Sequence, residues 1–204
     1  MPRPILANDR RMLPIAHSSV TAALDSIYAE LATTGAAISA TNRGALDQAA
    51  HALRGARRVF TLGAGRSGIA LNMTAMRLMH LGLTVHVVGE ATAPAIETGD
   101  VLLVASGSGT TEGIVRAARM AREVGASTVA ITTDPSSTIA EVSDVTIVVP
   151  AAQKLDRDNA ASVQYAGSLF EQSVAIIGDA LFHALWKASG QTADELWPRH
   201  SNLE

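Results

Sequence analysis

Residues 101–112 read Val-Leu-Leu-Val-Ala-Ser-Gly-Ser-Gly-Thr-Thr-Glu, and the architecture of the chain can be worked out from them. The five apolar residues from Val101 to Ala105 have the length and composition of a strand buried on both faces. From Ile114 to Val124 the apolar residues recur with a helical period instead. The stretch therefore predicts a strand that leads through a loop rich in glycine and hydroxyl groups into a helix.

The loop between this strand and helix has the composition of a phosphate-binding loop. It brings side-chain hydroxyls, backbone N–H groups and the positive end of a helix to one point. Ser106, Ser108, Gly109 and Thr111 are the residues expected to bind the phosphate. The alternative is an ordinary turn in which Ser108 or Thr110 only caps the helix. No Gly-Lys-Ser/Thr follows, so the pattern disfavours nucleotide hydrolysis.

Strand and helix patterns alternate along the middle of the chain. Strands are predicted at 59–62, 84–88, 101–105, 128–132 and 145–149, with helices in the segments between most of them. This alternation predicts a five-stranded parallel sheet with helices on both faces, that is, an α/β fold of three αβα layers. Ligands of such sheets bind at the carboxyl ends of the strands, where the glycine-rich loops at Gly63 and Ser106 both begin.

The length of 204 residues fits one domain. Residues 1–16 are predicted to be a loose arm, because three prolines oppose regular structure there. Residues 17–58 hold N-terminal helices, from Ser19 to about Leu31 and from Thr41 to Leu53, with Gly35 and Gly44 as breaks. Residues 59–150 form the sheet core. Residues 151–204 comprise a polar flap (151–165), a long helix from about residue 167 to 188, and a C-terminal tail.

Composition narrows the class of protein. The chain has no cysteine and a formal net charge of −3. The lack of cysteine excludes disulfides and thiolate metal sites, and the absence of a dense Lys/Arg run disfavours nucleic-acid binding. We find no apolar segment long enough to span a bilayer and no signal-peptide pattern. These features predict a cytoplasmic protein without a nucleic-acid or membrane partner.

A second glycine-rich loop, Gly63-Ala-Gly-Arg-Ser-Gly68, follows the first predicted strand. Its spacing also occurs in dinucleotide-binding folds, in which Glu90 would be the acid that binds a ribose. Arg66, however, is better suited to bind a phosphate or a sugar hydroxyl opposite Ser106. Arg66 and Ser67 are therefore predicted to bind substrate and to stabilise an oxyanion. A tight turn with a surface arginine remains the alternative.

Several short segments also occur in a recognisable order: GAGRSG (63–68), MRLMHLG (76–82), VVGE (87–90), SGSG (106–109), GSLFEQ (167–172) and RHSNLE (199–204). Together they resemble the 6-phospho-3-hexuloisomerase family of sugar isomerase (SIS) domain enzymes. Relatives often carry Glu directly after SGSG, whereas this chain has Thr110 there and an acid at Glu112. This difference bears on the role of the acid at position 112, and it leaves the prediction of a phosphate-binding loop unchanged.

The resemblance implies a flavodoxin-like domain that interconverts D-arabino-hex-3-ulose 6-phosphate and D-fructose 6-phosphate. This reaction belongs to the ribulose monophosphate pathway of formaldehyde assimilation. The resemblance also implies a homotetramer whose sites draw on neighbouring subunits, with no metal and no cofactor. Independently, the helices near residues 20–31 and 167–188 carry more apolar surface than one small sheet covers, which predicts a homo-oligomer.

The implied reaction moves a proton between C2 and C3 through a 2,3-enediolate. Glu171, early in an otherwise apolar helix, is the candidate base; the alternative is an acid that only stabilises the helix dipole. His80 is the second candidate catalytic residue, an acid/base for ring opening with an ordinary histidine pKa, unless it is a core or interface residue. His80 and His200 are both candidates to act in a neighbouring subunit's site. The remaining histidines lack metal-ligand spacing.

Two other functions fit an SIS domain. One is another phosphosugar isomerase, acting on arabinose 5-phosphate or a heptose phosphate. The other is a non-catalytic sugar-phosphate sensor, of the kind attached to DNA-binding modules. Residues 1–58 contain no basic helix-turn-helix pattern, which disfavours the sensor, and turnover by the purified protein would separate these possibilities.

Overall fold

The computed structural model describes residues 19–151 and 162–203. At its centre is a parallel sheet of five strands in the order β2-β1-β3-β4-β5. The strands are β1 (Val59–Gly63), β2 (Val85–Val87), β3 (Val101–Ala105), β4 (Ser127–Thr132) and β5 (Val145–Val148). This sheet confirms the predicted strands to within one or two residues at each end.

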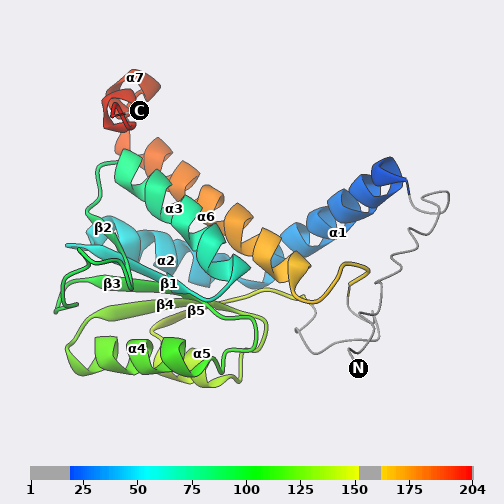
Figure 1. Cartoon of the computed structure of the whole chain (residues 1–204), viewed down its shortest axis with the longest axis horizontal. Coiled ribbons are helices and arrows are strands. Elements are labelled where there is room, and N and C mark those ends of the chain that lie inside the picture. Colours follow the sequence, from blue (N-terminus) through cyan, green and yellow to red (C-terminus); the bar gives the residue numbers. More distant parts are fainter. Residues whose placement is uncertain (1–18, 152–161, 204) are drawn as a thin grey trace, which may run out of the picture.

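Helices cover both faces of the sheet, as Figure 1 shows. They are α1 (Val20–Thr41), α2 (Arg43–Gly55), α3 (Arg66–His80), α4 (Glu112–Glu123), α5 (Thr138–Val142), α6 (Ser168–Ser189) and α7 (Ala193–Leu196). The long helices α3 and α6 pack side by side on one face, together with α2, while α4 and α5 lie on the other. The predicted three-layer α/β fold is thus confirmed.

The strands contribute to two separate hydrophobic cores because successive side chains point to opposite faces. In β3, Leu103 packs into the core under α2, α3 and α6, and Leu102 and Val104 pack into the core under α4 and α5. All five residues of β3 are buried, as the continuous apolar run predicted. The central strand is therefore covered on both sides, which leaves its carboxyl end as the place where the chain meets solvent.

The predicted breaks at Gly35 and Gly44 are wrong. A single helix, α1, runs through Gly35, and the chain breaks at Asn42 instead. The Asn42 side chain donates to Val148 O and accepts from Val148 N, each at 2.8 Å. These two bonds pair the helix junction with the end of β5, so a contact over 106 positions sets the break rather than local glycine content.

The predicted arm (1–16) and most of the predicted flap (152–161) lie outside the described residues. Among the helices of the described ranges, none has the length and apolarity needed to cross a membrane.

Candidate active site

The two glycine-rich loops leave the sheet side by side. β1 and β3 are neighbouring strands, and their last residues, Gly63 and Ala105, are register partners. Between these strands the chain direction across the sheet reverses, since β2 lies on one side and β4 on the other. Open α/β sheets bind their ligands at this switch point. The predicted meeting of the two loops is therefore present in the fold.

The glycines of the first loop allow a close backbone contact. A Cβ on Gly63 would lie 2.8 Å from Gly68 Cα, and a Cβ on Gly68 would lie 2.6 Å from Gly63 O. Gly65, with φ of 58°, adopts a conformation that favours glycine. The spacing thus brings the end of β1 against the first turn of α3. Ser67 is buried in that turn.

The second loop is held by its own hydroxyl groups. Ser106 Oγ lies 3.0 Å from Thr111 Oγ1, and Ser108 Oγ accepts from both Thr110 N and Thr110 Oγ1. Gly109 has φ of 64°, and a Cβ there would overlap Ser137. We conclude that Gly109 is required for the path of the loop.

Neither Ser108 nor Thr110 caps α4, so the simple capping alternative is wrong. The residue at the cap position is Thr111, whose side chain makes no capping hydrogen bond. The first turn of α4 therefore has no side-chain cap, which is the arrangement that suits an anion at a helix N-terminus. Glu112, the acid displaced from the family pattern, is the first residue of α4 and is exposed.

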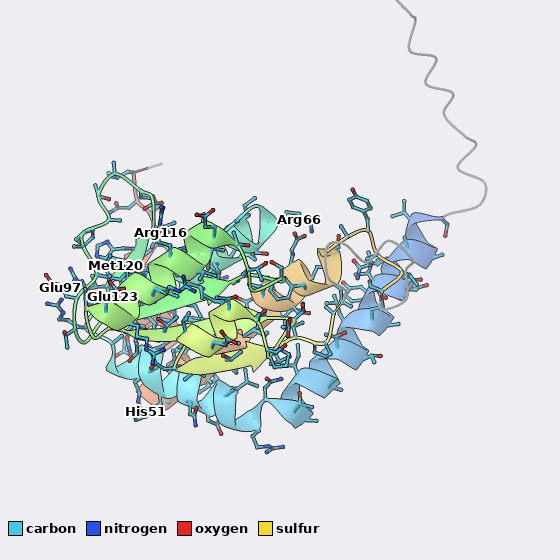
Figure 2. All side chains as sticks on the ribbon, turned by 90° about the horizontal axis from the view of Figure 1, so that it is seen from below. His51, Arg66, Glu97, Arg116, Met120 and Glu123 are labelled. Atoms are coloured by element: carbon cyan, nitrogen blue, oxygen red, sulfur yellow. The ribbon has the colours of Figure 1, made fainter. Side chains whose placement is uncertain are left out.

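Arg66 and Glu171 form an ion pair across the start of two helices. Arg66 is the first residue of α3, and its Nε lies 3.0 Å from Glu171 Oε2 in the first turn of α6. The Glu171 side chain is 9% exposed and that of Arg66 is 63% exposed. Figure 2 shows Arg66 at this edge of the molecule, beside the first turns of α6. The structure thus places a buried carboxylate and an accessible guanidinium together.

A cavity of about 550 Å³ opens beside the loops on the α4 face. Gly63, Ala64 and Thr111 line it, as does Arg116 from the second turn of α4. Figure 2 shows Arg116 and Met120 along that helix. Sequence reasoning missed Arg116, although its place five residues after the loop on a helix that begins at the site was a usable signal. Glu171 lies outside this cavity, on the α6 side of the loops.

His80 lies at the opposite end of α3 from Arg66. At about 1.5 Å per residue, the helix separates them by about 21 Å. The His80 ring stacks on that of His200, with centroids 3.9 Å apart. Arg199 Nη1 donates to His80 O, and this contact fixes the tail against the end of α3. Within one chain, the two histidines therefore belong together but are remote from Glu171.

The ordinary pKa expected for His80 is wrong. Burial lowers its pKa, and the neighbouring positive charges of His200 and Arg77 lower it further. Its Nδ1 is buried and has no hydrogen-bond partner among the described residues. His80 is thus disposed to be neutral near pH 7.

Comparison with known proteins relates the chain to sugar-phosphate isomerases. The family model described as the SIS domain matches residues 52–174. A Mycobacterium gastri protein named 3-hexulose-6-phosphate isomerase is 56% identical over 147 residues, which cover 72% of this chain and 74% of that protein. A Bacillus subtilis (strain 168) protein of the same name is 36% identical over 160 residues, covering 78% and 86% of the two chains.

A solved structure of similar fold comes from Methanococcus jannaschii. It superimposes with a TM-score of 0.77 at 29% identity, covering 89% of this chain and 99% of that one, and a molecular function of 3-hexulose-6-phosphate isomerase was inferred for it. The glycine-rich loops and the Arg66–Glu171 pair lie within the segment that the family model matches. This chain belongs to the SIS domain family.

Proposed function

We propose that the protein is an isomerase that interconverts 3-hexulose 6-phosphate and fructose 6-phosphate. The observation that carries the proposal is the Arg66–Glu171 pair at the carboxyl edge of the sheet, beside two loops suited to a phosphate. The 56% identity to a protein named for this reaction supports the choice of substrate. A phosphorylated sugar does not cross membranes unaided, which agrees with a cytoplasmic site of action.

In the proposed mechanism, Ser106, Ser108 and Thr111 bind the phosphate together with the N–H groups of α4. The Gly109 backbone shapes this loop. The other end of the open-chain sugar then extends toward Arg66 and Glu171.

Glu171 removes the C2 proton of the 3-keto sugar and returns a proton to C3 on the same face. The negative charge of the 2,3-enediolate develops on the carbonyl oxygen at C3. A proton then passes from the C2 hydroxyl to this oxygen, so that C2 becomes the carbonyl carbon and C3 carries the hydroxyl. Arg66 stabilises this charge, and the first turn of α3, with Ser67, faces the same point. No step needs a metal ion or a redox group, since proton transfers alone move the carbonyl from C3 to C2.

A second copy of the chain supplies His80 to this site. An apolar stripe on α3 is exposed, with Ile69 at 64%, Met73 at 51% and Met76 at 57%. These residues share one helix face with Arg66 and His80, and Met73 lies midway between the two in the sequence. If two α3 helices pack antiparallel about Met73, the end of the partner's α3, which carries His80 stacked on His200, lies beside Arg66. A cavity of about 680 Å³ lies next to His200 and is lined by Arg77 of α3.

Exposed apolar residues elsewhere support a larger assembly. Val20, Leu24 and Tyr28 are exposed on the half of α1 that extends from the body of the molecule, and Ile176 is exposed on α6. The α1 positions are separate from the α3 stripe, whereas Ile176 lines a cavity together with Arg77 of α3. A dimer formed through α3 therefore retains a second apolar surface on α1. Two such surfaces on each chain are what a homotetramer with two kinds of interface requires.

The test is turnover by the purified protein. Formaldehyde, ribulose 5-phosphate and a hexulose-phosphate synthase generate the 3-keto sugar, and the formation of fructose 6-phosphate is then followed. We expect conversion that depends on this protein. Arabinose 5-phosphate and sedoheptulose 7-phosphate serve as alternative substrates. Preference for either of them, or binding of fructose 6-phosphate without turnover, would contradict the proposal in favour of another isomerase or a sensor.

A further inference from the structure

Glu30 of α1 binds the segment that leads into α6. Its Oε1 accepts a hydrogen bond from Val163 N at 2.8 Å. Its Oε2 accepts from Ser162 Oγ at 3.2 Å and from Gln164 Nε2 at 3.0 Å. Three donors from consecutive residues therefore converge on one carboxylate that lies 132 to 134 positions earlier in the chain.

The hydrogen bonds continue from this segment into α6. Gln164 Oε1 accepts from Gln172 Nε2 at 2.9 Å, and Gln172 directly follows Glu171. A carboxylate has acceptors only, so Gln164 must turn its Nε2 toward Glu30. The Gln164 oxygen is then the atom that faces Gln172. In this way the Glu30 carboxylate sets the orientation of the Gln164 side-chain amide and, through it, that of Gln172.

The backbone between this segment and α6 has an unusual conformation. Ala166 has φ of 51°, in the left-handed region that alanine rarely adopts. On its C-terminal side, Ser168 N and Ser168 Oγ both donate to Tyr165 O. Such a conformation persists where neighbouring contacts hold it in place. The contacts of Glu30 lie immediately before Ala166 and hold that side of the turn.

We infer that Glu30 is a positioning residue for Glu171, an inference that rests on the proposed function. Glu30 fixes the entry to α6 and the polarity of the Gln164–Gln172 pair, so that Glu171 meets Arg66 and the substrate in one orientation. Proton transfer needs the carboxylate within hydrogen-bond reach, and a small displacement lowers the rate. Substrate affinity, which depends on the phosphate loop, is affected far less.

Glu30→Gln tests this inference because it keeps the shape of the side chain but replaces one acceptor oxygen with an N–H donor, which then faces either Val163 N or Gln164 Nε2. We expect kcat to fall by at least about tenfold while KM stays within about twofold. Asp25→Asn is the matched control, since Asp25 is an exposed acid on the same helix, and it should leave both constants unchanged. An unchanged kcat in Glu30→Gln would overturn the inference, as would a loss confined to KM.

A double variant tests the polarity of the network. In Glu30→Gln/Gln164→Glu, the amide at position 30 donates to the carboxylate at position 164, which still accepts from Gln172 Nε2. We expect kcat to return to within about threefold of the wild type, a coupling that independent sites do not show. Gln164→Glu alone opposes two carboxylates and should lower kcat. A double variant no better than Glu30→Gln would contradict the inference.

Hydrogen exchange at the Val163 amide, measured without substrate, separates this inference from the proposed function. Exchange should be faster in Glu30→Gln than in the wild type and slow again in the double variant. If the wild type fails to convert the 3-keto sugar, the proposed function fails, while this exchange pattern still supports Glu30 as the residue that holds the entry to α6. Equal exchange in all three proteins would overturn that role.

Discussion

Arg66 Nε and Glu171 Oε2 lie 3.0 Å apart and join the first turns of α3 and α6, which are more than 100 residues apart in the chain. The contact engages one carboxylate oxygen with a guanidinium that is otherwise accessible. Arg66 can therefore orient Glu171 and still reach a substrate oxygen. The pair lies beside both glycine-rich loops, so one end of the sheet carries both the candidate base and the candidate phosphate site.

The phosphate loop should distinguish fructose 6-phosphate from fructose. Ser108→Ala and Thr111→Ala each remove a hydroxyl that the proposed mechanism directs at the phosphate alone. Each loss should weaken binding of fructose 6-phosphate by about 1.5–3 kcal/mol, the value of a charge-assisted hydrogen bond. Calorimetric titration with the two sugars measures the difference. Equal losses for both ligands would place the phosphate elsewhere.

Stability should fall in acid because of His80. Its pKa is lowered by burial and by His200 and Arg77, whereas the unfolded chain binds the proton near the usual pKa of about 6.5. Between these two values the unfolded state holds more protons, so stability decreases as the pH falls through that window.

Thermal unfolding of the wild type and of His80→Asn at about pH 7.5 and about pH 5 measures this effect. The decrease in Tm on acidification should be smaller in the variant. His51→Asn, at an exposed position on α2, is the control and should behave as the wild type. An equal decrease in all three proteins would remove His80 from the pH dependence.

The packing of α3 on α6 should be sensitive at Gly178. A Cβ at this position would overlap the Thr74 side chain, so Gly178→Ala should destabilise the protein by about 1–3 kcal/mol. Gly35, in the middle of α1, has no neighbour within 4 Å of an added Cβ. Gly35→Ala should therefore stabilise by about 0.5–1 kcal/mol through helix propensity. Denaturant unfolding of both variants checks the contrast, and changes of the same sign would contradict it.

Sites shared between subunits should allow complementation. In a dimer with antiparallel α3 helices, Glu171 of one chain works with His80 of the other. Assayed from fructose 6-phosphate, whose ring must open before enolisation, Glu171→Gln and His80→Ala are each expected to have little activity alone. Coexpression should restore about a quarter of wild-type activity, since half of randomly mixed dimers contain one intact site of two. Hybrids purified with two tags and lacking activity would place both residues in the site of one chain.

Much of the fold was predictable because the strands and loops carry local signals. The buried run at 101–105 and the strand–helix alternation identified the sheet, and a parallel sheet brings both glycine-rich loops to one edge. The break at Asn42 was not predictable in this way, since it depends on two hydrogen bonds to Val148.

The candidate site was predictable only in part. The sequence indicated the residue types of the phosphate loop, and resemblance added Glu171 and His80. Nothing in the sequence indicated that Glu171 forms an ion pair with Arg66, because that contact depends on how α3 and α6 pack together. The remoteness of His80 and the exposed stripe at Ile69, Met73 and Met76 likewise required the direction of α3 to be known.

Incubation of fructose 6-phosphate with the enzyme in D₂O, followed by NMR, tests the proposed 2,3-enediolate chemistry most directly. The proposed mechanism predicts that deuterium enters C3 and that Glu171→Gln lowers this exchange by at least about a hundredfold, the lower end of the range for a lost general base. The variant should keep its affinity for the sugar phosphate. Deuterium at C1, which marks a 1,2-enediol, or undiminished exchange in Glu171→Gln, would contradict it.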